Sequence, residues 1–279
     1  MNSALLVEKV GEEHEESLGE YIIHHLQDSH EWNLFGYHIQ LPTFTPVQIF
    51  GISVDFSITL HVLMMWFASL FLILMFWLTF REKEGKRTPL KVALESVYLF
   101  IRDEISIPNL GPNHGVSMSP FLATIFLFIL TCNLMGLIPL FSTATGNIGV
   151  TASLAIITFF MIQGMGIKKR GLLGYLRTLV PHGVPIFLYP ILIPIEILGL
   201  FTKPFALAMR LFANMLAGHT VIYALLGLII VLGSLFISPV SIIFALFINL
   251  LELLVALLQA YIFTMLSAVF IGMAVIGEH

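Results

Sequence analysis

The stretch SIIFALFINLLELLVALLQAYIFTMLSAVFIGMAVI, residues Ser241–Ile276, is almost uninterruptedly apolar over 36 residues and includes one charged residue, Glu252. A helix of that length is about 54 Å long at about 1.5 Å per residue, whereas the hydrocarbon core of a membrane is about 30 Å thick. A straight helix would need a tilt above roughly 50°, beyond the usual range of about 0 to 40°. We therefore expect a long, strongly tilted membrane helix.

A second apolar segment of unusual length precedes the first and runs from Ile186 to Phe236. Residues 237–239 interrupt the apolar sequence between the two segments. Three prolines, Pro190, Pro194 and Pro204, are expected to break or kink the first half of the earlier segment. The sequence thus predicts a hairpin of two long, tilted helices at about residues 186–236 and 241–276.

Three further apolar runs have the length of an ordinary membrane crossing, about 20 residues. They predict crossings at about residues 56–80, 121–141 and 148–167. Between the first two, Thr88 followed by Pro89 is typical of the start of a helix. Apolar residues then recur at spacings of three and four as far as Ile105, which predicts an amphipathic helix at the membrane surface over about 89–106.

The composition agrees with these segments. The chain of 279 residues is 58% hydrophobic and 11% charged, with a mean hydropathy of +0.95, whereas an ordinary soluble domain is roughly one quarter charged. A water-soluble globular fold is excluded. The predicted fold class is an all-α integral membrane protein with about five membrane-embedded helical segments and one interfacial amphipathic helix.

The charges also predict an orientation. Residues 1–31 hold eight acidic residues and one lysine, whereas basic residues cluster after the first crossing and again after the third. By the positive-inside rule both clusters are cytoplasmic, which places the N-terminus outside and the C-terminus in the cytoplasm. We expect residues 1–50 to form an acidic extracytoplasmic segment and residues 51–279 a single membrane domain.

Several functions find no support in the sequence. There is no basic face for nucleic acid, and one cysteine, Cys132, cannot form a disulfide framework or a cysteine-based metal site within the chain. There is also no glycine-rich phosphate loop, metal-binding helix pair or nucleophile elbow. We expect no cofactor, no metal and no bond-making chemistry in this chain.

The two long helices carry a set of polar residues that is unusual at membrane depth. Glu196, Lys203 and Arg210 are seven residues apart each time and so share nearly one helical face, with Asn214 one turn further on. His219 lies about 180° around the axis from Arg210. Ionisable groups at this depth are costly and usually mark a pathway.

The hairpin geometry pairs some of these residues across the turn. If the turn lies near residue 235, Arg210 and Gln259 should be level, and so should His219 and Glu252. Arg210 stays charged and is expected to act as a fixed positive charge, whereas His219 and Glu252 can gain and lose protons. The competing structural interpretation is that Arg210 is paired within the bundle, to Glu196 or Glu252, and that the polar residues only hold helices together.

Other histidines are interpreted as ordinary residues near water without the spacing of metal ligands. They are His14, His24, His25, His30, His61 and His182.

The stretch KPFALAMRLFANMLAGH, residues 203–219, followed by Glu252 and then by LLQAYIF, residues 257–263, resembles subunit a of F-type ATP synthase. The resemblance extends over the whole chain. It implies an all-helical stator subunit that faces a rotating ring of c subunits and contains two offset half-channels, which protonate and deprotonate a carboxyl group on the ring.

The resemblance also implies roles, partners and a location. Arg210 would be the essential arginine against the ring, with Asn214 and Gln259 as its polar neighbours, and Glu196, His219 and Glu252 would belong to the proton path. Many bacterial members have an acid at the position of His219 and a histidine at that of Glu252, so this chain resembles the exchanged arrangement. The implied partners are c-ring proteolipid subunits, peripheral stalk b subunits, the soluble ATPase sector and membrane lipid, in a bacterial plasma (inner) membrane.

An alternative remains open from the residues alone. A self-contained ion channel or secondary transporter could also line a site at the membrane midplane with broken, charged helices. The absence of an internal repeat relating the two halves of the sequence argues against it.

Overall fold

The computed structural model describes residues 31–34, 37–44, 47–49, 52–55, 57–81, 88–138, 141–178, 185–232 and 238–276. In this part of the chain, five helical segments are long and apolar enough to cross a membrane: Leu60–Arg81, Pro89–Gly136, Ile148–Tyr175, Tyr189–Leu225 and Pro239–Ile276. The predicted class, an all-α integral membrane protein, is confirmed. His14, His24, His25, His30 and His182 lie outside the described residues.

The helices follow one another with short connections. They are α2 (Leu60–Arg81), α3 (Pro89–Phe100), α4 (Ile107–Gly136), α5 (Ile148–Thr178), α6 (Tyr189–Leu232) and α7 (Ser238–Ile276), with single turns of 3-10 helix, η2 (Ala144–Gly146) and η3 (Ile186–Leu188). The largest packed cluster lies where α4, α5, α6 and α7 meet, and it includes Leu122, Leu211 and Phe263, all fully buried.

The segment before α2 contains two short hairpins that the sequence analysis did not anticipate. β1 (Glu31–Leu34) pairs antiparallel with β2 (Tyr37–Gln40), and β3 (Val47–Ile49) pairs antiparallel with β4 (Ile52–Val54). Trp32 of β1 packs its ring against Phe67 of α2, at 5.9 Å between ring centroids, and against Phe141, at 6.5 Å. The first hairpin therefore packs against the helical bundle through Trp32.

The region between α2 and α4 begins as predicted and then departs from the prediction. Thr88 caps α3, and its hydroxyl accepts a hydrogen bond from the backbone N–H of Lys91, with Pro89 in the first turn. α3 does not end in a loop after residue 106. It continues through a π-helical turn, Ile101–Ser106, into α4, which begins well before residue 121 and kinks at Gly111, where φ is 76°. Glycine adopts that φ without steric cost.

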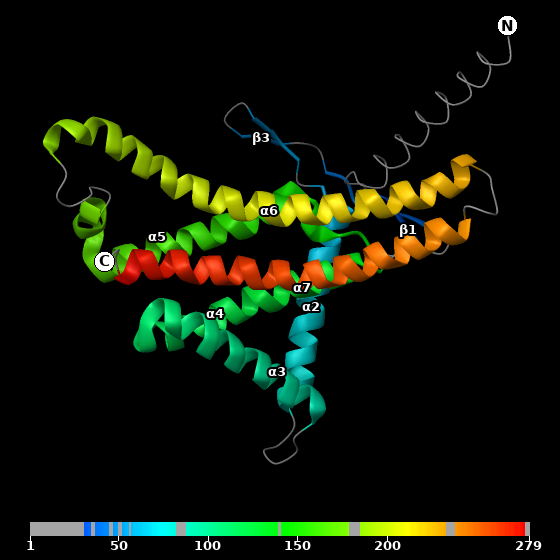
Figure 1. Ribbon diagram of the computed structural model, residues 1–279, viewed down its shortest axis with the longest axis horizontal. Helices are drawn as coiled ribbons and strands as arrows, with labels where there is room; N and C mark the ends of the chain where they lie inside the picture. The colour runs from blue at the N-terminus through cyan, green and yellow to red at the C-terminus, as the bar shows by residue number, and fades with distance from the viewer. Residues whose placement is uncertain are drawn as a thin grey trace, which may run out of the picture.

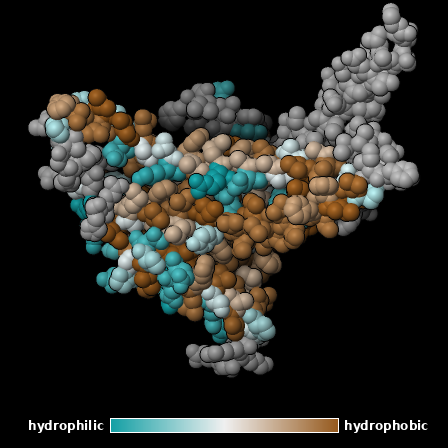
Figure 2. Space-filling model, viewed as in Figure 1, coloured by the Kyte–Doolittle hydropathy of each residue, from teal (hydrophilic) through white to brown (hydrophobic). Residues whose placement is uncertain are grey.

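The hairpin of α6 and α7 is the longest feature of the molecule. Figure 1 shows the two helices side by side along the long axis, with α2 running across them at a steep angle. If α2 crosses the membrane along its normal, α6 and α7 are strongly inclined to that normal. Much of the surface of α7 is apolar and exposed, and Figure 2 shows this face in hydrophobic colours. The bundle therefore leaves an apolar face uncovered by the described residues.

On its opposite side, α7 packs closely against α4 at Gly272. A Cβ atom added at Gly272 would overlap the backbone carbonyl oxygen of Asn109 and would lie 3.1 Å from its carbonyl carbon. Backbone cannot move aside as a flexible side chain can, so α7 reaches α4 here only because residue 272 has no side chain.

Replacing Gly272 with alanine should therefore push α7 away from α4. We expect a loss of about 1 to 3 kcal/mol of stability, as for other overpacked positions, measured as a lower unfolding temperature of the purified chain in mild detergent. The matched control is Gly164→Ala in α5, where an added Cβ meets nothing within 4 Å. Equal unfolding temperatures for the two variants would contradict this account of the contact.

Candidate functional site

Arg210 lies near the middle of α6 and its side chain is exposed. It makes no hydrogen bond or ion pair with any residue that the structure describes, so the pairing with Glu196 or Glu252 considered from the sequence does not occur there. Figure 2 shows a hydrophilic area over the middle of α6, between apolar surfaces. Arg210 and Asn214 are exposed residues of the middle of this helix. The arginine is open to a partner outside this chain.

His219 of α6 and Glu252 of α7 face each other across the hairpin. Their nearest atoms, Nε2 of His219 and Oε1 of Glu252, are 3.5 Å apart, which confirms the prediction that these residues are level. The glutamate side chain is 3% exposed and that of the histidine 13%. Neither carboxyl oxygen of Glu252 accepts a hydrogen bond from the described residues, so His219 is its one polar contact among them.

The carboxyl group of Glu252 occupies space that a glycine leaves free. A Cβ atom at Gly218, the residue before His219, would lie 2.7 Å from Oε1 and 2.8 Å from Cδ of Glu252. Such distances are shorter than real contacts allow. Gly218 therefore permits the glutamate to lie against α6 beside the imidazole.

The second polar pair across the hairpin differs from the prediction. Gln259 is 2% exposed and accepts a hydrogen bond at Oε1 from Nδ2 of Asn214, at 2.9 Å. Gln259 is therefore hydrogen-bonded to Asn214, one helical turn after Arg210, and makes no hydrogen bond to Arg210 among the described residues. Nε2 of Gln259 is buried and has no hydrogen-bond partner among the described residues.

Glu196 and Lys203 lie on the same helix as Arg210, nearer the start of α6. Both are partly exposed. Nζ of Lys203 lies 5.5 Å from the centroid of the Phe270 ring on α7. Neither side chain makes a hydrogen bond or ion pair with the residues described here, and the structure does not bring them to the His219–Glu252 pair.

The structure adds polar residues that the sequence analysis did not single out. His61 of α2, interpreted from the sequence as an ordinary residue near water, is 4% exposed and lies within hydrogen-bond distance of Ser142. The next residue, Thr143, is hydrogen-bonded to Nε2 of His219. The hydroxyl residues of the sequence STAT, residues 142–145, could have indicated a polar site. They were not assigned because helical periodicity does not predict where the side chains of a loop lie.

A buried amide links this loop to both α4 and α7. Asn133 accepts a hydrogen bond from the hydroxyl of Thr145, at 2.7 Å, and donates one to the backbone oxygen of Ala256, at 3.2 Å. Ala256 is one helical turn from Glu252. The two hydrogen bonds of Asn133 thus join the loop to the helix that carries Glu252.

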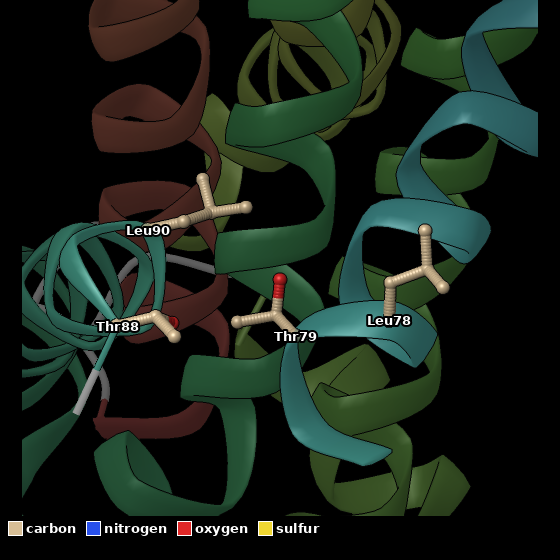
Figure 3. A pocket seen from close by; sticks show the side chains of 4 residues that line it. All are labelled: Leu78, Thr79, Thr88 and Leu90. Atoms are coloured by element: carbon tan, nitrogen blue, oxygen red, sulfur yellow. The ribbon is translucent and has the colours of Figure 1, made fainter. Parts of the chain in front are cut away.

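A small pocket elsewhere does not belong to this group of residues. It has a volume of about 220 Å³ and lies where α2 ends and α3 begins, lined by Leu78, Thr79, Thr88 and Leu90. Figure 3 shows these side chains on the two helices. None of the four is titratable, and Leu78 and Thr79 lie at the opposite end of α2 from His61.

The arrangement combines one permanent charge with one titratable pair. The Arg210 guanidinium remains protonated and cannot carry a proton, whereas imidazole and carboxyl groups can each bind and release one. Within the described ranges, no group of three or more His, Cys, Asp or Glu residues could hold a metal ion. The chemistry that these side chains can perform is proton transfer beside a fixed charge.

Comparison with known proteins gives a consistent picture. Residues 62–272 match the family model described as ATP synthase A chain. The chain is similar to proteins named ATP synthase subunit a from Myxococcus xanthus, with 51% identity covering 81% of this chain and 75% of the relative, and from Chloroherpeton thalassium, with 49% identity covering 92% and 77%. A third relative, ATP synthase subunit a 2 from Chlorobium luteolum, is 47% identical over 95% of this chain and 78% of its own length.

The register of the hairpin can be tested with cysteine pairs in a Cys132→Ala background. The pairs at 214 with 259 and at 219 with 252 should be joined several times faster by a short bifunctional thiol reagent than the crossed pairs, 214 with 252 and 219 with 259. The crossed positions are displaced by about 7 to 11 Å along the helix axes. Mass spectrometry of the linked peptides measures the yields, and equally fast linkage of the crossed pairs would contradict the register.

Proposed function

Because this chain belongs to the ATP synthase A chain family, we propose that it is the proton-translocating stator subunit of a rotary ATP synthase. In this proposal two offset aqueous half-channels protonate and deprotonate a carboxyl group on each c subunit of a rotating ring. Proton flow is thereby coupled to ring rotation and ATP synthesis, while other chains perform the nucleotide chemistry. The observation that carries the proposal is the exposed Arg210, which lacks a partner among the described residues.

Arg210 attracts the ring carboxylate and separates the two half-channels. A permanent cation on an apolar helix favours the ionised form of a carboxyl group that comes near it. It also repels a proton that would cross directly from one half-channel to the other. The uncovered apolar face of α7 supports a neighbouring apolar partner such as the ring, whose helices would cover it.

His219 and Glu252 form the proton relay of one half-channel. Their separation of 3.5 Å and their burial support transfer between the two groups with little contact with bulk water. Asn214 and Gln259 line the path between this pair and the ring, and Glu196 belongs to the opposite half-channel. Each charge that crosses the membrane releases about 2.3 kcal/mol per 100 mV, which several crossings per turn accumulate into useful work.

The same proposal assigns an orientation and further partners. The N-terminus lies outside and the C-terminus in the cytoplasm of a bacterial plasma (inner) membrane, with residues 1–50 as an extracytoplasmic segment and residues 51–279 as the membrane domain. Basic residues at the end of α2 and within α5, Arg81 and Lys168–Arg170, support this orientation. The peripheral stalk b subunits hold the chain against the turning ring, and the soluble ATPase sector completes the complex.

Replacing Arg210 with alanine in the complete complex should abolish ATP-driven proton pumping and raise passive proton leak. Arg210→Lys should also perform poorly, because a lysine can give up its proton when it is desolvated. Dye quenching in inverted membrane vesicles measures pumping, and proton flux after removal of the soluble sector measures leak. Lys203→Ala on the same helix is the charge-removing control and should retain pumping. Coupled pumping in Arg210→Ala would refute the role of the arginine.

Exchanging the relay residues tests whether they occupy one site. The double variant His219→Glu with Glu252→His should pump more than either single variant, because the 3.5 Å contact allows the two groups to serve in either order. ATP-driven pumping, normalised to the amount of assembled complex, measures the difference. Three equally inactive variants, each assembled, would rule out a shared site.

A further inference from the structure

The loop between α4 and α5 brings a hydroxyl group directly onto the titratable pair. Thr143 is hydrogen-bonded through Oγ1 to Nε2 of His219 and is 6% exposed. Of the residues with described coordinates, Thr143 and Glu252 are the two whose polar side-chain atoms reach this nitrogen. We propose that Thr143 is the hydroxyl that delivers protons to His219, and that His61 positions it. This inference rests on the proton path proposed above.

Both partners of His219 meet the same ring nitrogen, so one nitrogen can receive and release the proton. With its hydrogen on Nδ1, a neutral imidazole accepts at Nε2 from the Thr143 hydroxyl. A hydronium ion from the extracytoplasmic water gives a proton to Oγ1 of Thr143 while the hydroxyl proton passes to Nε2, which leaves water, an unchanged threonine and an imidazolium. The imidazolium then gives the Nε2 proton to the Glu252 carboxylate. One proton moves, and the imidazole returns to its first state.

Thr143 is held in place by hydrogen bonds on both sides along the loop. The residue before it, Ser142, lies with Oγ 3.2 Å from Nε2 of His61, in the first turn of α2. Two residues after it, Thr145 donates to Oδ1 of Asn133 on α4, at 2.7 Å. These anchors come from two different helices. Hydrogen bonds to α2 and α4 therefore hold the loop in the position that directs the Thr143 hydroxyl at α6.

A glycine on α4 leaves room for this placement. A Cβ atom at Gly136 would lie 2.8 Å from both Cβ and Cγ2 of Thr143 and would overlap its hydroxyl oxygen. Any other residue at position 136 would displace the threonine from His219. Gly136 therefore makes room for Thr143, just as Gly218 makes room for the Glu252 carboxyl group. Both polar partners of His219 lie where they do because a glycine leaves space for them.

The boundary between water and protein falls within this loop. Ser142 is partly exposed, whereas Thr143 is buried. In the proposed path, the proton is handed from solvent to the protein at this point, between the partly exposed Ser142 and the buried Thr143. His61 is buried and its link to the relay runs through Ser142. It acts as a positioning residue.

The first test replaces Thr143 in the complete complex and measures passive proton flux after the soluble sector is removed. Thr143→Val keeps the shape and removes the hydroxyl. We expect its flux to fall by about tenfold to a hundredfold, somewhat less than the roughly 10²- to 10⁴-fold contribution of positioned proton-transfer groups, because water partly replaces the hydroxyl. Thr143→Ser should restore most of the flux. The control is Thr158→Val, since among the described residues this buried hydroxyl hydrogen-bonds to the backbone oxygen of Leu154 alone.

A solvent isotope effect separates proton delivery from a structural role. If Thr143 transfers the proton, flux through Thr143→Val should be slowed more by D₂O than flux through the unchanged complex, because delivery has become the slow step. An unchanged isotope effect together with full flux in Thr143→Val would overturn the inference.

The second test asks whether His61 acts through Thr143. His61→Ala should lower flux in the unchanged complex and should lower it no further in Thr143→Val, whereas His61→Gln, which can still hydrogen-bond to Ser142, should retain more flux than His61→Ala. Equal losses in both backgrounds would mean that His61 does not position the threonine. Non-additive losses are expected for residues that act as one unit.

The variant Glu252→Gln separates the role of Thr143 from the proton path as a whole. Glu252→Gln should block flux if the proposed proton path is right. Blocked flux in Glu252→Gln with full flux in Thr143→Val would reject Thr143 alone and leave the path in place. Full flux in both variants would reject the path and the inference together.

Discussion

The permanent positive charge of Arg210 on an apolar helix imposes the largest electrostatic cost in the described part of this chain. A charged arginine at the centre of a membrane helix costs about 2.5 to 3.5 kcal/mol on insertion scales. Arg210 offsets none of that cost through an ion pair with the described part of the chain, because Glu252 faces His219 and Glu196 is more than three turns away along α6. A carboxylate supplied from outside the chain would offset it. In the proposed function, assembly with the ring would supply that carboxylate and neutralise Arg210.

The length of α6 keeps the fixed charge apart from the titratable pair. Arg210 and His219 are nine residues apart, about 13 Å along the helix and on opposite sides of it. A helix perpendicular to the membrane would spread these groups across much of its thickness. An inclined hairpin instead displaces them sideways, along the surface that a partner would face (Figure 1). A proton that leaves the His219–Glu252 pair would then reach Arg210 only by travelling on a carrier, which is what a rotating carboxyl group provides.

The sequence predicted the features that follow from helical periodicity and chain length. The Thr88 cap and the facing of His219 and Glu252 are set by residue spacing within one helix or across one short turn, and both are confirmed. Gln259 pairs with Asn214 rather than with Arg210, because residue spacing shows which positions are nearly level but not which of two side chains one turn apart reaches across the hairpin. Thr143 and His61 could not be assigned, because a loop and a distant helix bring them together and no periodic pattern connects them.

The positions of Thr143 and Glu252 beside His219 depend on two glycines as well as on the polar residues themselves. Gly218 leaves the space that the Glu252 carboxyl group fills, and Gly136 leaves the space that Thr143 fills. Both polar partners of His219, Thr143 and Glu252, therefore lie close to it because a helix next to each of them has no side chain at that point, where a larger residue would force them away. Helix packing through small residues is usually a means of holding membrane helices together. Here the same close approach sets the distances between proton-carrying groups, so the packing of the bundle and the geometry of the relay cannot vary independently.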